Sequence, residues 1–307
     1  MCAAASKPEP IVGGIELGGT KSVALIARGN TVLDMLRVPT GDPGPTLDRL
    51  SAQLAQWAES HAIAALGIGS FGPIGLDSTA VDYGSITTTP KLRWSGVDVR
   101  GHFASRFAVP IGFDTDVAGA ALAEERWGAA AGCHVHVYLT IGTGIGGGVV
   151  VDGRPLHGMV HPELGHVRVR RLPGDSFPGI CPWQGDCIEG LASGPAIAAR
   201  AGMAATELPP DHPVWSQVAE DLAELMSTLI LTLSPERILI GGGVGSGQAA
   251  LLPPIREQTA RRLGGYVAGL TPAALDRLIR APLLGDKAGP LGAIALGLMA
   301  LDEAGVR

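Results

Sequence analysis

The chain has 307 residues, enough for two domains of ordinary size that each bury their own core. Hydrophobic residues make up 46% and charged residues 17% of the sequence, a globular composition that excludes a disordered chain. The formal net charge is −6 and no long basic run occurs, which makes nucleic acid and anionic membranes poor candidates for a partner.

The first part of the chain alternates predicted strands and helices. Ile11–Ile26 is predicted to form a β-hairpin whose turn contains Gly18 and Gly19. Apolar residues that recur every three or four positions predict a helix over Leu47–Ala62. The elements expected next are a strand at Ala64–Gly69, a turn at Ser70–Pro73, a strand at Pro110–Phe113 and a helix at Val117–Ala131.

The same order of elements then begins again. The expected elements are a strand at Val135–Ile141, a glycine turn at Gly142–Gly148, a strand at Val149–Val151, a helix at Val218–Leu233, a strand at Arg237–Ile240 and a helix at Leu291–Leu301. A strand, a glycine turn and a second strand therefore occur near residue 18 and again near residue 144. We expect two related α/β halves with a cleft between them.

Both glycine turns have the components of a phosphate-binding site. Glycines leave backbone N–H groups uncovered, and in the first turn Thr20 adds a hydroxyl and Lys21 a positive charge. Thr143 and Gly144 belong to a similar second turn. A structural hairpin explains either turn alone, but two such turns in corresponding halves favour anion binding. Neither turn is a P-loop, and the second continues into a strand, which argues against a dinucleotide-binding dehydrogenase.

No apolar stretch reaches the roughly 20 residues that a membrane-spanning helix needs. The N-terminal segment Met1–Pro10 has no apolar core, so a signal peptide is not expected. The four cysteines, Cys2, Cys133, Cys181 and Cys187, are compatible with thiols in a reducing compartment. We therefore expect a cytoplasmic protein without a membrane partner.

Several motifs together resemble one family. They are Glu16-Leu17-Gly18-Gly19-Thr20-Lys21, Asp114-Thr115-Asp116, the Thr143 glycine turn, His161-Pro162-Glu163-Leu164-Gly165-His166, Cys181-Pro182 and Cys187-Ile188-Glu189-Gly190. From Gly13 to Gly297 the chain resembles the ROK family (repressor, open reading frame, kinase), and within it the bacterial fructokinases. ROK repressors carry an N-terminal helix-turn-helix, whereas ten residues precede Ile11 here, which favours the kinase branch.

The resemblance implies an α/β fold of two actin-like domains, of the ribonuclease H-like or hexokinase type, with a cleft between them. We expect an N-terminal domain at residues 1–117 and a C-terminal domain at residues 118–289. The helix at about 290–304 is expected to pack back on the first domain, and residues 161–190 to form a zinc-binding loop in the second. Homodimers are frequent in the family, so a homodimer is expected.

The resemblance also implies a role for each matching residue. Gly18, Gly19, Thr20, Lys21, Thr143 and Gly144 would face the phosphates of ATP, and Gly241, Gly242 and Gly243 would lie near its adenosine. Gly72, Asp116, Glu163, His166 and Glu189 would contact the sugar. Asp116 would also be the catalytic base that accepts the proton of the sugar hydroxyl, while Mg²⁺ bridges the phosphates. From its position alone, Asp116 could instead cap the helix that it precedes.

The family's zinc site is matched only in part. His166, Cys181 and Cys187 correspond to three zinc ligands, but Gln184 stands where fructokinases of the family have a histidine. Glutamine is a weak zinc ligand, so we expect an open three-ligand site that binds Zn²⁺ more weakly than a complete set. Ala118 also departs from the family, which often has asparagine there, and this leaves the preferred hexose open.

We expect an ATP-dependent hexose kinase, a phosphotransferase to an alcohol group, that converts D-fructose to fructose 6-phosphate. One alternative is a mannokinase or glucokinase of the same family, because the orientation of one hydroxyl decides between these sugars. The other is a sugar-binding regulator without catalysis, against which the retained Asp116 argues.

Overall fold

A computed structural model describes residues 9–89 and 91–305. Cys2 and most of the N-terminal segment discussed above lie outside the described residues. The chain divides into two compact units. The first takes the described residues up to Ala123, Gly158–His161, and the described residues from Lys287 onward, and the second takes Glu124–His157 and Pro162–Asp286.

A five-stranded sheet forms the centre of the first unit, with the strand order β3-β2-β1-β4-β5. The strands are β1 (Ile11–Leu17), β2 (Lys21–Arg28), β3 (Thr31–Pro39), β4 (Ile63–Ser70) and β5 (Ile111–Thr115). The helices are α1 (Pro43–Ala58), the 3-10 helix η1 (Leu92–Trp94), α2 (Val99–Ala104), α3 (Asp116–Trp127), whose last turn belongs to the second unit, and α10 (Ala288–Glu303).

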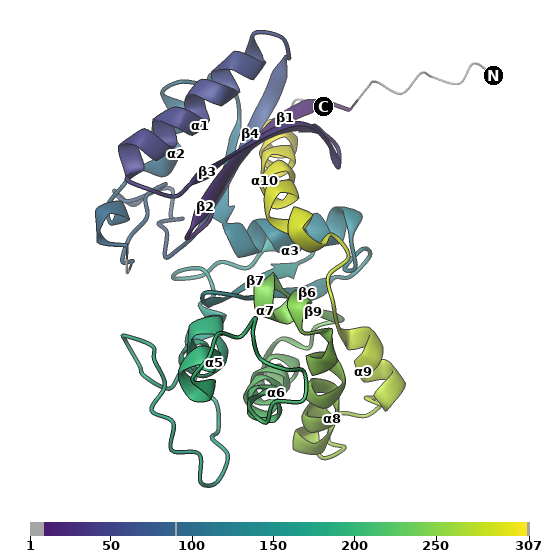
Figure 1. Cartoon of the computed structure of the whole chain (residues 1–307). Helices are drawn as coiled ribbons and strands as arrows, with labels where there is room; N and C mark the ends of the chain where they lie inside the picture. The colour runs from purple at the N-terminus through teal and green to yellow at the C-terminus, as the bar shows by residue number, and fades with distance from the viewer. Residues whose placement is uncertain (1–8, 90, 306–307) are drawn as a thin grey trace, which may run out of the picture. The chain divides into compact units, whose positions relative to one another are not determined.

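The C-terminal helix α10 packs on β1, β4 and β5 (Figure 1). Its backbone approaches the sheet closely, because a Cβ at Gly67 would collide with the carbonyl of Ala293 and one at Gly112 with that of Leu296. The central strand β4 and the edge strand β5 therefore both have glycine where the helix crosses them. The helix and the sheet bury each other's side chains although β1 and α10 are more than 200 positions apart in the sequence, as where Ile294 packs over Gly14.

The helix predicted over Leu47–Ala62 is present, but it begins and ends one turn earlier, as α1. The predicted apolar face is buried against the sheet. The shift has a local reason, because Pro43 lies in the first turn, where its fixed φ favours a helix and its missing N–H has no partner to lose.

A second five-stranded sheet forms the centre of the second unit, with the order β10-β9-β6-β7-β8. The strands are β6 (Val135–Ile141), β7 (Ile145–Val151), β8 (Arg154–Pro155), β9 (Arg237–Gly241) and β10 (Ile279–Arg280). The helices are η2 (Leu164–His166), α4 (Ile188–Ala192), α5 (Gly194–Ala201), α6 (Val214–Leu233), α7 (Gly242–Gly247), η3 (Ala249–Leu251), α8 (Leu252–Leu263), α9 (Pro272–Leu278) and η4 (Gly285–Lys287).

The two sheets have the same topology. In each, the first strand is antiparallel to the second and parallel to the fourth, and the fifth strand lies parallel beyond the fourth. β1 to β5 therefore correspond to β6 to β10 in order. The prediction of two related α/β halves is confirmed, and so is the mixed α/β fold class.

The extent of the second glycine turn was predicted wrongly. The turn was expected to run over Gly142–Gly148, but β7 already begins at Ile145 and pairs with β6 throughout. Three glycines of the motif are thus strand residues. At one of them, Gly147, a Cβ would press on the side chains of Leu164 and Leu139, so this glycine makes room for η2 above the sheet.

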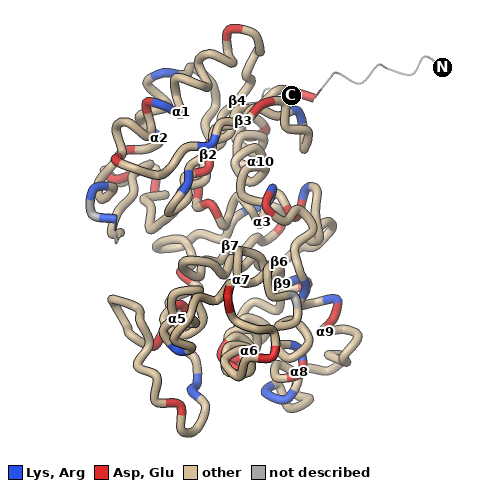
Figure 2. The backbone as a smooth tube through the Cα atoms, in the orientation of Figure 1, with Lys and Arg blue, Asp and Glu red and all other residues tan. Residues whose placement is uncertain are grey.

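None of the described helices combines the length and the apolar composition that a membrane crossing requires. Lysine and arginine positions are spread over both units and interleaved with aspartate and glutamate (Figure 2).

Candidate functional site

In the first unit, the carboxyl ends of three strands lie next to one another at one edge of the sheet. β1 pairs with β4 so that Leu17 is opposite Ser70, and β4 pairs with β5 so that Ser70 is opposite Thr115. The β1–β2 turn, Gly72 and Asp116 follow these strand ends directly. Three segments that are far apart in the sequence, each assigned to the site by the resemblance, therefore meet at this edge.

The β1–β2 turn is held in shape by backbone hydrogen bonds and by one threonine. The N–H of Gly18 donates to the carbonyl of Lys21 at 3.1 Å. The hydroxyl of Thr40 donates to the carbonyl of Gly18 at 2.8 Å, and the N–H of Thr40 donates to the carbonyl of Thr20 at 2.9 Å. The side chains of Thr20 and Lys21 are exposed, so the predicted hydroxyl and positive charge are accessible to a ligand.

Asp116 is the first residue of α3, at the end of β5. The hydroxyl of Thr115 accepts the N–H of Ala118 at 3.1 Å, which is the hydrogen bond that an N-capping side chain makes. One oxygen of Asp116 accepts the adjacent N–H of Val117 at 2.9 Å. Because Thr115 already caps the helix, capping does not account for a carboxylate at position 116.

Glu16 is a second acidic group in this neighbourhood. Burial, followed by the nearby charge of Asp116, raises the pKa of Glu16 to about 7, while Lys21 and Arg37 act in the opposite direction. Its Oε2 is buried and has no hydrogen-bond partner, and a Cβ at Gly289 of α10 would collide with its other oxygen. The carboxylate of Glu16 is therefore closely packed, and one of its two oxygens has no hydrogen-bond donor beside it.

The corresponding edge of the second unit carries the second group of glycines. β6 is parallel to β9, with Thr140 opposite Gly241. Gly242 has a φ of +83°, and a Cβ there would press on the backbone of Ile141, so only glycine suits this close approach. The structure thus brings together the predicted residues Thr143, Gly144, Gly241, Gly242 and Gly243.

The predicted sugar-contacting residues of the second unit gather around the start of β7. The Oε2 of Glu189 accepts the N–H of Ile145 at 2.9 Å. Gly165, between Glu163 and His166, packs so closely on the carbonyl of Ile145 that a Cβ could not be accommodated. Glu163 is exposed at the beginning of η2. The glycine turn and these acidic residues are therefore parts of one local structure.

His166, Cys181 and Cys187 form a compact cluster. Their ligand atoms all lie within 4.8 Å of one another, and Nδ1 of His166 is 3.7 Å from Sγ of Cys181 and 3.5 Å from Sγ of Cys187. Both cysteines are buried and reduced, and burial raises the pKa of Cys187 to about 11. Two sulfurs and an imidazole nitrogen suit Zn²⁺. Gln184 is exposed, and the donor set offers zinc three protein ligands.

A buried ionic group holds the loop that carries this cluster. Arg200 of α5 donates to Asp221 of α6 at 2.8 Å and lies 3.3 Å from Asp175 of the loop. Asp175 also pairs with Arg171 at 2.8 Å, and the guanidinium of Arg200 lies over the ring of Phe177. The loop is thus anchored to two helices through side chains that are almost fully buried.

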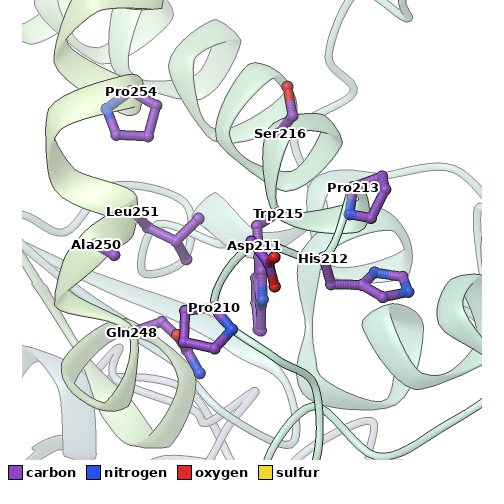
Figure 3. A pocket seen from close by; sticks show the side chains of 10 residues that line it. All are labelled: Pro210, Asp211, His212, Pro213, Trp215, Ser216, Gln248, Ala250, Leu251 and Pro254. Atoms are coloured by element: carbon purple, nitrogen blue, oxygen red, sulfur yellow. The ribbon is translucent and has the colours of Figure 1, made fainter.

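A pocket of about 260 Å³ opens in the second unit beyond α7 (Figure 3). Its walls come from the loop before α6, the start of α6, and the segment between α7 and α8. They include the rings of Pro210 and Trp215 and the polar side chains of Asp211, His212 and Gln248. Because α7 begins at Gly242, the glycine group and the pocket lie at the two ends of one short helix.

The sequence singled out the glycine turns, Asp116, the acidic residues and the metal cluster, but it did not assign a role to Thr40, to Glu16 or to the pocket. Thr40 and Glu16 act through contacts that depend on how β1, β2 and α10 pack. The pocket is formed by side chains without a motif. The only available signal was the position of Glu16 inside the first glycine motif.

A model of the ROK family matches residues 12–299. A fructokinase from Zymomonas mobilis is 46% identical over 301 residues, which cover 95% of this chain and 98% of that protein. A ROK hexokinase from Thermus thermophilus is similar in structure, with a TM-score of 0.76, 28% identity and coverage of 95% of this chain and 99% of that one. A ROK glucokinase from Streptomyces griseus, solved with glucose and AMPPNP, gives a TM-score of 0.73 at 26% identity, with coverage of 94% and 99%.

Proposed function

The chain belongs to the ROK family, and from this premise we propose that it is an ATP-dependent fructokinase that phosphorylates the 6-hydroxyl of D-fructose. Its fold is that of the family's sugar kinases, with two actin-like α/β domains. The observation that carries the proposal is the meeting of the first glycine turn, Gly72 and Asp116 at one edge of the first sheet. The 46% identity to a fructokinase, against 26–28% to the hexokinase and glucokinase structures, favours fructose.

Asp116 would act as the general base. The O6 oxygen of fructose attacks the γ-phosphorus of ATP, and the bond between that phosphorus and the oxygen bridging to the β-phosphate breaks. Asp116 takes the proton of the hydroxyl, and ADP leaves with the electron pair of the broken bond. Glu163, His166 and Glu189 would accept or donate hydrogen bonds to the other sugar hydroxyls. A sugar that leaves one of these groups unpaired would be rejected.

Mg²⁺ suits the acidic pair in the first unit. Glu16 has a buried oxygen without a partner next to the charge of Asp116, and carboxylate oxygens are the ligands that Mg²⁺ prefers. Glu16 would hold the ion, with Asp116 nearby. When bound, Mg²⁺ would supply positive charge against the phosphate oxygens of ATP.

Glu16→Gln is expected to raise the Mg²⁺ concentration that gives half-maximal activity, and an unchanged Mg²⁺ dependence would exclude Glu16 from this role.

The glycine turns suit a nucleotide, because they leave backbone N–H groups uncovered for anionic oxygens. We assign Gly18, Gly19, Thr20, Lys21, Thr143 and Gly144 to the phosphates and Gly241, Gly242 and Gly243 to the adenosine. The pocket beyond α7 suits the base, because proline and tryptophan side chains line it together with polar side chains (Figure 3). Ala250→Trp would fill this pocket from its exposed wall. The variant is expected to raise KM for ATP and leave KM for fructose near its original value, whereas equal KM values for ATP would rule out this pocket as the base site.

Zn²⁺ would be held by His166, Cys181 and Cys187, with the fourth position open because Gln184 is a weak ligand. Bound zinc would fix the loop that carries Glu163 and His166. Metal analysis of protein purified without chelator or added metal tests this, since a fully active protein without zinc would contradict it.

We expect the protein to act as a homodimer in the cytoplasm, where ATP is available.

The decisive experiment follows ADP release with Mg-ATP and a panel of fructose, mannose, glucose and N-acetylmannosamine. We expect kcat/KM to be well above the others for fructose. A preference for mannose or glucose would contradict fructose as the substrate but would leave the proposed phosphoryl-transfer mechanism in place. Ala118 would then be the first position to examine. A folded protein that binds ATP but turns over none of these sugars would refute the kinase.

A further inference from the structure

Lys91 lies beside the first glycine turn, although nothing in its sequence context connects it with that turn. Among the described residues other than the two chain neighbours of Gly19, the atom nearest to the position that a Cβ of Gly19 would occupy is Cε of Lys91, at 3.9 Å. The open face of Gly19, on which a phosphate oxygen would approach the backbone N–H groups, is therefore bordered by the end of a lysine side chain.

Aromatic contacts fix the direction of this side chain. The ammonium of Lys91 lies over the ring of Phe71, 5.9 Å from its centroid. The ring of Phe71 meets that of Trp94 edge to face at 5.5 Å. The indole N–H of Trp94 in turn donates to the carbonyl of Gly41 at 2.9 Å, next to Thr40, which holds the turn.

The backbone around Lys91 is equally well tied to this group. The N–H of Trp94 donates to the carbonyl of Lys91 at 2.8 Å, and the N–H of Lys91 donates to the hydroxyl of Thr89 at 3.3 Å. Phe71 follows the end of β4 and donates its N–H to the carbonyl of Leu17, the last residue before the turn. The lysine and the glycine turn are thus held by the same small set of contacts.

The charge of Lys91 is available to a ligand. Among the described residues, no carboxylate forms an ion pair with it, whereas its neighbour Arg93 pairs with Asp42. Lys91 is half-buried, so its positive charge is only partly screened by solvent. A half-buried cation without an acidic partner, beside uncovered backbone N–H groups, is an arrangement that attracts phosphate oxygens.

We propose that Lys91 is a phosphate-binding residue of the first glycine turn, and that it contacts the phosphoryl oxygens that pass from the nucleotide to the sugar. The proposal rests on the proposed kinase function. Lys91 would act together with Lys21, which directly follows the turn in the sequence. Two cations would then face the negative charge that develops on the transferred phosphoryl group.

The test compares Lys91→Met, Lys91→Arg and Arg93→Gln. Methionine keeps most of the contact with Phe71 and removes the charge, and arginine restores the charge. Arg93→Gln removes one positive charge two residues away, from an exposed side chain paired with Asp42, and serves as the matched control. For each protein, kcat and KM for Mg-ATP and fructose are measured, together with the Kd values of ATP and adenosine and the thermal midpoint.

We expect Lys91→Met to lower kcat/KM for Mg-ATP by about tenfold to a hundredfold, and to weaken ATP binding while leaving the Kd of adenosine unchanged. Lys91→Arg should recover most of the loss, and Arg93→Gln should match the wild type. Equal losses in Lys91→Met and Arg93→Gln, or a parallel loss of ATP and adenosine binding, would overturn the proposal, as would a Lys91→Met enzyme within twofold of wild type.

The two proposals fail in different ways. If the wild type has no turnover with any sugar, the kinase function fails, and the ratio of ATP to adenosine affinity still decides whether Lys91 binds phosphate. If the wild type is active and that ratio is the same in Lys91→Met, only the role of Lys91 fails.

Discussion

At the start of α3 the hydroxyl of Thr115 makes the capping hydrogen bond, so that Asp116 is left for the proposed role of general base. Thr115 caps the helix through the N–H of Ala118, while Asp116 stands at the strand end with Glu16 near it. The sequence alone left both tasks open for Asp116. The structure separates them because it shows which side chain makes the capping hydrogen bond, and this geometry makes the two tasks testable one at a time.

Asp116→Asn should lower kcat by about 10²–10⁴-fold, because an amide cannot accept the proton of the sugar hydroxyl. Fructose binding should largely remain, as measured by calorimetry, since the amide is similar in size. Thr115→Val is the companion variant. It should lower the free energy of unfolding by about 1 kcal/mol through loss of the cap and leave kcat comparatively unaffected. Turnover that survives in Asp116→Asn would show that another group is the base.

The residues of the site divide into those that a motif reveals and those that only packing reveals. Gly18, Asp116 and Cys181 lie in recognisable local patterns, so their positions could be predicted. The pairing of Glu16 with Asp116 depends on two strands separated by a third, and the approach of Lys91 to Gly19 depends on an aromatic contact. Such relations between distant residues leave no local pattern, because each partner looks ordinary in its own segment.

At the scale of elements, strands and helices with strong periodicity were predicted well, and those without it were missed. The hairpin of β1 and β2 and the buried faces of α1 and α6 follow from apolar spacing. The edge strand β3 is largely exposed and has mixed residues, and α8 is rich in charged and polar residues. Neither pattern distinguishes them from loops, and tertiary contacts decide their conformation.

The ionic group between α5, α6 and the metal-cluster loop makes stability depend on pH. Burial raises the pKa of Asp221 to about 6, although Arg200 acts in the opposite direction. A carboxyl with a raised pKa in the folded state stabilises that state fully at pH values below its unfolded pKa, and this contribution is lost as the pH rises through about 6.

The free energy of unfolding of the wild type, relative to Asp221→Asn, should therefore fall by up to ~3 kcal/mol between pH 4 and pH 7. Urea unfolding at several pH values measures it. Asp276→Asn removes an aspartate from an exposed pair with Arg256 and should show a much weaker dependence. If the difference in the free energy of unfolding between the wild type and Asp221→Asn stayed constant, or rose with pH, it would contradict a raised pKa of Asp221 as the cause.

The cluster of His166, Cys181 and Cys187 offers a metal ion three ligands, and the exposed Gln184 lies in the same loop. Gln184→His should tighten Zn²⁺ binding by more than about tenfold, because it offers a fourth nitrogen or sulfur donor. Competition with a zinc-binding dye measures the affinity, and Gln184→Ala provides the control with no added ligand. If the histidine variant bound zinc no more tightly than the alanine variant, the fourth position would not lie within reach of residue 184.

At the scale of the whole molecule, the repeated strand order explains why two glycine turns occur. Each lies between the first two strands of its sheet, and in each unit the next parallel strand ends beside it. The repeat could be predicted because the turns have similar residues. The contribution of α10 to the first unit could be expected only from the family resemblance, since an apolar helix gives no indication of which sheet it covers.

A chain that stops after Asp286 would lack α10 and leave one face of β1, β4 and β5 uncovered. Amide hydrogen exchange should then show a loss of protection in these strands, while β6, β7 and β9 keep theirs, because the second unit has its own core. Full-length protein gives the reference. Retained protection in β1 and β4 of the shortened chain would mean that the first sheet is stable without its helix.

The position of α10 also sets an order of events on the ribosome. At about 5–20 residues per second, its residues are made roughly 15–60 s after β1. The N-terminal unit is therefore begun first and completed last, and its central strands wait with an apolar face exposed until the final helix leaves the exit tunnel. In the cell, the segment that most needs a chaperone is accordingly expected at the beginning of the chain, not at its end.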